Sequence, residues 1–174
     1  ALVRARFVAG DPAVAEKVDV VRREVLCQQR DEAGLAREVV AMRNRMREHL
    51  LSEENTENGE FHLKQGEGGI VDIEFMVQYA VLAWSHRVPE LAHWSDNVRI
   101  LETLGREGLF DQTECAALTE AYLAYRSAAH QLALQQMPGM VAAERFGDLR
   151  SAVSAKWRHL FAGVNLDEVE QQQE

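Results

Sequence analysis

Cysteine is rare in this chain, and its two copies form no recognisable motif. Cys27 and Cys115 lie far apart, outside any CxxC spacing and within apolar helical stretches. This predicts two buried free thiols and suits a reducing cytoplasm. The six histidines show neither HxxxH nor HExxH spacing, so they predict no metal site. We therefore expect neither a disulfide framework nor a metal centre.

Basic charge and long apolar runs are also scarce. The 19 basic residues face 28 acidic ones, for a net charge of −9, which argues against nucleic-acid binding. No apolar run approaches the ~18 residues of a membrane span, and no signal-peptide pattern is visible. The 47% of hydrophobic residues suffices for a core, so a globular, cytoplasmic protein is expected.

Strand-forming residues other than valine are few, which favours helices. Among 174 residues there are three Ile, four Thr and three Tyr, and Pro12, Pro89 and Pro138 all lie at expected helix edges. The pattern predicts an all-α protein, a bundle of about six helices joined by short loops, in a single domain covering 1–174. Since the chain begins at Ala1 in what resembles the middle of a helix, we expect a fragment of a longer multidomain enzyme.

The first two long helices are predicted from their apolar spacing. Residues 1–8 read as the end of a helix that stops at Gly10, and Asp11 caps a new helix. The inward-facing residues predicted for the first two full helices are Val14, Val18, Val21 and Val25, then Leu35, Val39, Met42, Met46 and Leu50. Four arginines in the second helix, interleaved with Glu38 and Glu48, predict a solvated helix face. They are Arg37, Arg43, Arg45 and Arg47.

Later signals predict a loop, a short extended piece and two helix caps. Residues 52–59 are polar and acidic and predict a mobile loop, and residues 61–64 predict a short extended piece. Ser95 is expected to cap one helix, and Asp111 with Glu114 predicts a capping box at the start of the next. That long helix is expected to end at Pro138-Gly139.

One segment, KQGEGGIVDIEF at residues 64–75, is distinctive. Three glycines within four positions allow a sharp turn, and a helix begins directly after them. The first turn of that helix offers free N–H groups to an anion, and Lys64 adds a nearby cation. Asp72 and Glu74 would repel a phosphate but suit Mg²⁺ or the helix dipole. The alternative is a plain glycine-rich connector, since neither GxxxxGK[ST] nor GxGxxG after a strand is present.

Four segments carry a resemblance to a known family. KQGEGGIVDIEFMVQYAVL at 64–82 resembles the helical-domain signature of the glutamine synthetase adenylyltransferases, bifunctional adenylylating and deadenylylating enzymes. ALVRARFVAGD at 1–11, WSDNVRILETL at 94–104 and HQLALQQMPG at 130–139 are similar in order and spacing. GGIVDIEF resembles the C-terminal, adenylylating copy. The related PII uridylyltransferases tend toward GGLRDIQ, so Glu74-Phe75 argue against them.

The resemblance implies a role in nitrogen regulation. The parent enzyme would transfer AMP from ATP to a tyrosine of glutamine synthetase with Mg²⁺, under control by PII signalling protein and glutamine. The family's Gly-Ser loop and DxD metal ligands are absent from this sequence, so we expect no catalytic residue here and no activity of the isolated chain. The residues implied as nucleotide or domain-interface candidates are Arg4, Arg6, Lys64, Glu67, Gly68, Gly69, Asp72 and Glu74.

Two alternatives to this function stay open. One is a helical protein-interaction module without a role in catalysis. The other is the corresponding helical domain of a PII uridylyltransferase. An upstream domain with a Gly-Ser loop and a DxD pair would favour a transferase over the interaction module.

Overall fold

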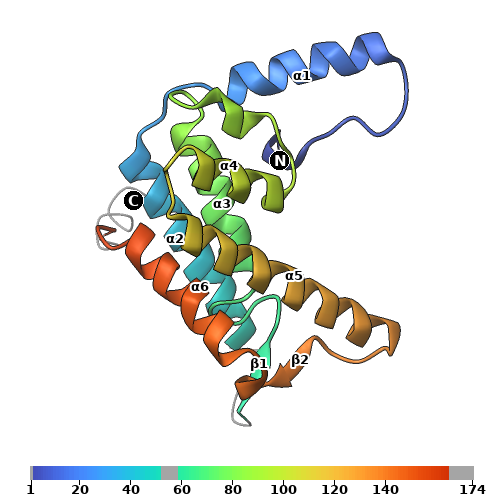
Figure 1. Cartoon of the computed structure of the whole chain (residues 1–174), viewed down its shortest axis with the longest axis vertical. Coiled ribbons are helices and arrows are strands. Elements are labelled where there is room, and N and C mark those ends of the chain that lie inside the picture. Colours follow the sequence, from blue (N-terminus) through green and yellow to red (C-terminus); the bar gives the residue numbers. More distant parts are fainter. Residues whose placement is uncertain (1, 52–58, 165–174) are drawn as a thin grey trace.

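The computed structural model describes residues 2–51 and 59–164, which form a helical bundle (Figure 1). Its α-helices are α1 (Pro12–Leu26), α2 (Glu32–Leu51), α3 (Ile70–Trp84), α4 (Asn97–Arg106), α5 (Gln112–Leu134) and α6 (Gly147–Leu160). Short 3₁₀ helices are η1 (Leu2–Arg4), η3 (Pro89–Ala92) and η4 (Ala143–Phe146), and the strands are β1 (Glu60–His62) and β2 (Met140–Ala142). The predicted six-helix bundle is confirmed.

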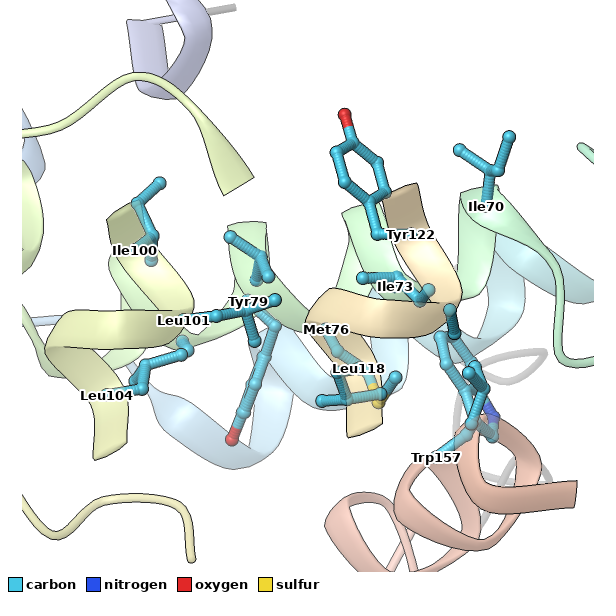
Figure 2. Close-up of a cluster of buried hydrophobic side chains, with 14 of the residues drawn as sticks. Ile70, Ile73, Met76, Tyr79, Ile100, Leu101, Leu104, Leu118, Tyr122 and Trp157 are labelled. Atoms are coloured by element: carbon cyan, nitrogen blue, oxygen red, sulfur yellow. The ribbon is translucent and has the colours of Figure 1, made fainter. Parts of the chain in front are cut away.

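Helix α3 lies at the centre of the bundle. It contacts α2, α4, α5 and α6, and ten of its 15 residues are buried. This follows from its mostly apolar sequence, in which Glu74 and Gln78 form the less buried side. Figure 2 shows Ile73 and Met76 of α3 near Leu118 of α5. Trp157 of α6 belongs to the same cluster of buried side chains. The start of α3 is therefore fixed by four neighbouring helices.

The two strands lie far apart in the sequence and pair with each other as a small antiparallel sheet. Phe61 pairs with Val141 in the register, and the Phe61 ring packs against Tyr125 of α5 at 5.6 Å between ring centroids. The sequence predicts an extended piece at 61–64 but gives no signal for β2. Helix α5 also ends earlier than predicted, at Leu134. Among the described residues, no helix is long and apolar enough to cross a membrane.

The ends of the helices follow their local chemistry in most cases. Asp11 caps α1 by accepting a hydrogen bond from the Ala13 N–H, and the capping box of Asp111 and Glu114 is present at α5. The predicted Ser95 cap is wrong, because Asp96 is the residue whose side chain accepts from the first turn of α4. The part of the predicted 52–59 loop from 52 to 58 lies outside the described residues.

The N-terminal region departs most from prediction. Residues 2–4 form a 3₁₀ turn instead of the end of an α-helix. Val14, Val18 and Val21 are each about half exposed, and the face of α1 toward the bundle carries Arg22 and Leu26. The prediction was wrong because α1 packs mainly on η1 and η3. Backbone carbonyls of these two elements face α1 and accept hydrogen bonds, which Arg22 donates and a valine could not.

The inward face of helix α2 agrees only in part with the prediction. Leu35 and Val39 pack against the core as predicted. Met42 is half exposed, while Ala36 and Arg43 are buried. The side chain of Leu50 lies outside the described residues. The predicted solvated arginine face is therefore wrong at Arg43, which is fully buried against the glycine turn.

Candidate functional site

The glycine turn is a tight backbone structure at the start of α3. The Gly69 N–H donates to the Gly66 carbonyl at 3.0 Å, and the Ile70 N–H donates to the Leu63 carbonyl at 3.0 Å. Gly68 has φ +77°, and a Cβ there would lie 2.6 Å from the Arg150 carbonyl oxygen on α6. Both the conformation and the neighbouring helix require glycine at this position.

The N–H groups predicted to be free for an anion are satisfied within the chain. Ile70 and Val71 donate to the carbonyls of Leu63 and Lys64, and one N–H of the turn binds a carboxylate of the chain itself. The Gly68 N–H donates to Asp72 Oδ2 at 2.7 Å. Arg47 Nη2 donates to the same oxygen at 2.9 Å, and Arg43 Nε donates to Asp72 Oδ1 at 2.5 Å. The side chains of Asp72 and Arg43 are completely buried. We call Arg43, Arg47, Gly68 and Asp72 the Asp72 cluster.

The Asp72 cluster joins α2 to the turn. Arg43 Nη2 also donates to the Gln65 carbonyl, so one guanidinium holds both the carboxylate and the turn backbone. Burial lowers the pKa of Arg43, and the neighbouring Asp72 carboxylate opposes that shift. A buried charge of this kind is tolerated because it is paired and hydrogen-bonded. The arrangement is that of a structural anchor.

Mg²⁺ does not fit the carboxylates of this turn. Magnesium needs several oxygen ligands in near-octahedral geometry, whereas Asp72 faces two guanidinium groups and an N–H. Glu74 Oε1 accepts from Arg4 Nη1 at 3.2 Å. Within residues 2–51 and 59–164, no group of three or more His, Cys, Asp and Glu side chains could hold a metal. No catalytic step is therefore assigned to a metal at these residues.

Two candidates distant in sequence, Arg4 and Glu74, come together. Arg4 Nη1 donates to Glu74 and also to Asn97 Oδ1 at 3.3 Å. The pair thus links the N-terminal segment to α3 and to the first residue of α4. The side chain of Arg4 is 42% exposed and that of Glu74 26% exposed, so this ion pair is a partly solvated contact at the surface.

The remaining candidates lie in different places. Lys64 and Glu67 are exposed, and the Glu67 backbone carbonyl accepts from Arg150 Nε at 3.0 Å. Gly69 is the first residue before α3, and a Cβ there would lie 2.8 Å from the Leu63 carbonyl oxygen. Arg6 is exposed and lines a pocket with Arg4. The eight candidates therefore do not form a single site.

Arg22 is a key residue that the sequence analysis missed. Its guanidinium donates to four backbone carbonyls, those of Leu2 and Val3 in η1, Ala92 in η3 and Trp94. The side chain is buried, and burial lowers the pKa of its guanidinium. Arg22 fixes the N-terminal segment, and with it Arg4 and Arg6, against the start of α4. No sequence signal identifies it, because the burial of Leu26, four residues later, is itself seen only in the structure.

The fold and the turn define a class of protein, a helical domain whose glycine turn is held by an internal carboxylate. Residues 40–138, more than half of the chain, match the family described as GlnD PII-uridylyltransferase. The chain belongs to this family. The match spans the Asp72 cluster and ends after α5. It makes the chain a nucleotidyltransferase-related helical domain and does not single out the glutamine synthetase adenylyltransferases.

Proposed function

We propose that the chain serves as the helical domain of a nucleotidyltransferase that modifies a protein of nitrogen regulation. The observation that carries this proposal is the family match over residues 40–138. The structure adds that the carboxylates of Asp72 and Glu74 are engaged in ion pairs. The chain therefore contributes packing and binding surfaces, and the catalytic metal ligands belong to another part of the enzyme.

Two versions of this function differ in nucleotide and target. The family match favours transfer of UMP from UTP to a PII signalling protein. The residues Glu74 and Phe75, with WSDNVRILETL at 94–104, favour transfer of AMP from ATP to a tyrosine of glutamine synthetase. Either reaction would use Mg²⁺ and take place in the cytoplasm. Both place the chain beside a nucleotide-binding catalytic domain.

A label-transfer assay tests the proposal and separates its two versions. The natural protein that contains this chain is incubated with Mg²⁺ and either [α-³²P]UTP or [α-³²P]ATP, each with purified PII or glutamine synthetase. Label on PII from UTP identifies the uridylyltransferase, and label on glutamine synthetase from ATP identifies the adenylyltransferase. Residues 1–174 alone are expected to transfer no label, and EDTA is expected to stop the reaction.

The same assay has an outcome that overturns the proposal. If the natural protein labels neither target with either nucleotide, the chain is not part of such a transferase. A helical protein-interaction module would then be the better description. Label transfer by purified residues 1–174 would instead contradict the assignment of the metal ligands to another part of the enzyme.

A further inference from the structure

A pocket of about 430 Å³ lies where the N-terminal segment meets α4 and α5. It is lined by Arg4 and Arg6 from the segment, by the residues around the start of α4, and by Tyr122 and Arg126 of α5. We call it the arginine pocket. Its size falls within the roughly 300–1,000 Å³ of small-molecule sites. It lies apart from the Asp72 cluster, with which it shares no residue.

The charge of the arginine pocket is opposite to that of the chain. Three of its lining residues are arginines, and Asp96 is the one acidic side chain among them, while the whole chain carries −9. Arg6 has no hydrogen bond or ion pair with any of the described residues. Arg126 is exposed, and its guanidinium lies over the Tyr122 ring, 5.5 Å from the centroid. Two cations are therefore available to a ligand.

A buried polar group supplies a second, independent observation. Asn97 lines the pocket and is 1% exposed. Its Oδ1 accepts from Arg4, which leaves Nδ2 as the donor end, and Nδ2 has no hydrogen-bond partner among the described residues. A buried donor without a partner costs roughly 1–3 kcal/mol. Because Nδ2 is itself covered, an acceptor oxygen in the pocket would relieve this cost after a small movement of the Asn97 side chain.

The pocket is already assembled without a ligand. Arg22 ties the carbonyls of Leu2 and Val3 to those of Ala92 and Trp94, which holds the segment bearing Arg4 and Arg6 next to α4. The Asp96 side chain is engaged at the helix start, where it accepts from the Arg99 N–H at 3.0 Å. The backbone that carries Arg4 and Arg6 is therefore already in place before a ligand binds, and the exposed side chains of Arg6 and Arg126 are what binding would order.

The geometry points to the arginine pocket as a binding site for a phosphate chain, of the kind carried by a nucleoside triphosphate. Guanidinium forks match phosphate oxygens in pairs, and Asn97 adds a neutral donor. The choice of a nucleotide as the source of that phosphate chain rests on the proposed function. The affinity for a phosphate chain rests on the pocket alone.

Calorimetry with sodium tripolyphosphate and the full 174-residue chain tests this site. Saturable one-to-one binding is expected, with affinity that falls as salt is raised. Arg6→Gln and Arg126→Gln are each expected to weaken it roughly ten- to a hundredfold, since each removes a charged hydrogen-bonding group. Arg99→Gln is the matched control, because it removes the same charge from α4 outside the pocket and is expected to leave binding unchanged.

Nuclear magnetic resonance supplies a second measurement, because a non-specific effect of charge would not change the signal of a buried side chain in the pocket. The Asn97 side-chain NH₂ signal is expected to shift on titration with tripolyphosphate in the unmodified chain. Absence of binding, or equal weakening by Arg99→Gln, overturns the proposal. Tighter binding of an acidic oligoglutamate peptide than of tripolyphosphate also overturns it, because the pocket would then recognise a protein segment.

A further arm compares ATP and UTP with tripolyphosphate. Similar affinities show that the phosphate chain carries recognition, and a gain with either nucleotide shows that the base adds contacts. The failures of this proposal and of the proposed function are distinguishable. Label transfer by the natural protein without tripolyphosphate binding refutes only the pocket, and binding without label transfer refutes only the transferase.

Discussion

Replacing Asp72 by asparagine is expected to destabilise the fold severely. The variant keeps the shape and one acceptor oxygen, so it leaves no cavity. It removes the negative charge that faces Arg43 and Arg47, and it places an NH₂ group against a guanidinium donor. Removing one partner of a fully buried ion pair typically costs about 3–5 kcal/mol. For a chain of this length, 1 kcal/mol shifts Tm by about 2–4 °C, so Tm should fall by roughly 6–20 °C.

Thermal and urea unfolding of the 174-residue chain measure this effect, with Glu74→Gln as the control. Glu74 lies on the same helix, two residues away, but its ion pair with Arg4 is partly solvated and is worth about 0–1 kcal/mol. Combining Asp72→Leu with Arg43→Met should cost less than the two single changes added together, since the fully buried charges of Asp72 and Arg43 are removed as a pair. Arg47 loses its carboxylate in the double variant as in Asp72→Leu alone, but its side chain is 27% exposed and reaches water. If Asp72→Asn costs no more than Glu74→Gln, the Asp72 cluster is not the anchor described here.

Three further predictions concern the turn, the thiols and the response to acid. Gly68→Ala should lower the free energy of unfolding more than Gly108→Ala. Both glycines have positive φ, but only a Cβ at position 68 would also meet the Arg150 carbonyl. Equal losses in urea unfolding would show that this contact does not destabilise the variant. At pH 8 a thiol reagent should modify Cys27 before Cys115, because burial raises the pKa of Cys115 to about 11; mass spectrometry showing the opposite order would contradict the structure. Burial raises the pKa of Glu114, but the hydrogen bonds from Lys156 and the Asp111 N–H, together with the charges of Lys156 and His159, outweigh burial and lower the pKa overall. The stabilisation is thus present above the unfolded-state pKa and lost as pH falls through the folded one. Lys156→Met should therefore reduce the loss of stability as pH falls below the ordinary glutamate pKa of 4.5, and an unchanged acid profile would rule the pair out.

The helices were largely predictable because their signals are local. Asp11, Asp111 and Glu114 act within one turn of their own helix, and such caps are readable from neighbouring letters. The apolar spacing after the glycine turn likewise predicts the helix that the structure shows as α3. The short pairing of β1 with β2 was not predictable, because it joins segments far apart in the sequence and involves only a few residues.

Only part of the candidate site was predictable from the sequence. The sequence identifies the turn and Asp72, yet the partner that neutralises Asp72 comes from α2, where Arg43 reads as one of several solvated arginines. Arg22 escapes prediction for the same reason, since a buried arginine is recognised only when the carbonyls around it are known. Charge pairing between distant elements is a property of the fold, and periodicity within one helix does not reveal it.

The most direct test of the account compares Asp72→Asn with Arg126→Gln in the natural protein that contains this chain. Label transfer is measured per folded molecule, at a temperature where both variants remain folded. The account predicts that Asp72→Asn keeps near-normal transfer despite a much lower Tm, since its role is to hold the fold. It predicts that Arg126→Gln lowers transfer roughly tenfold or more with Tm unchanged. The reverse pattern, with transfer abolished in folded Asp72→Asn and untouched in Arg126→Gln, would contradict the assignment of structure to the glycine turn and of binding to the arginine pocket.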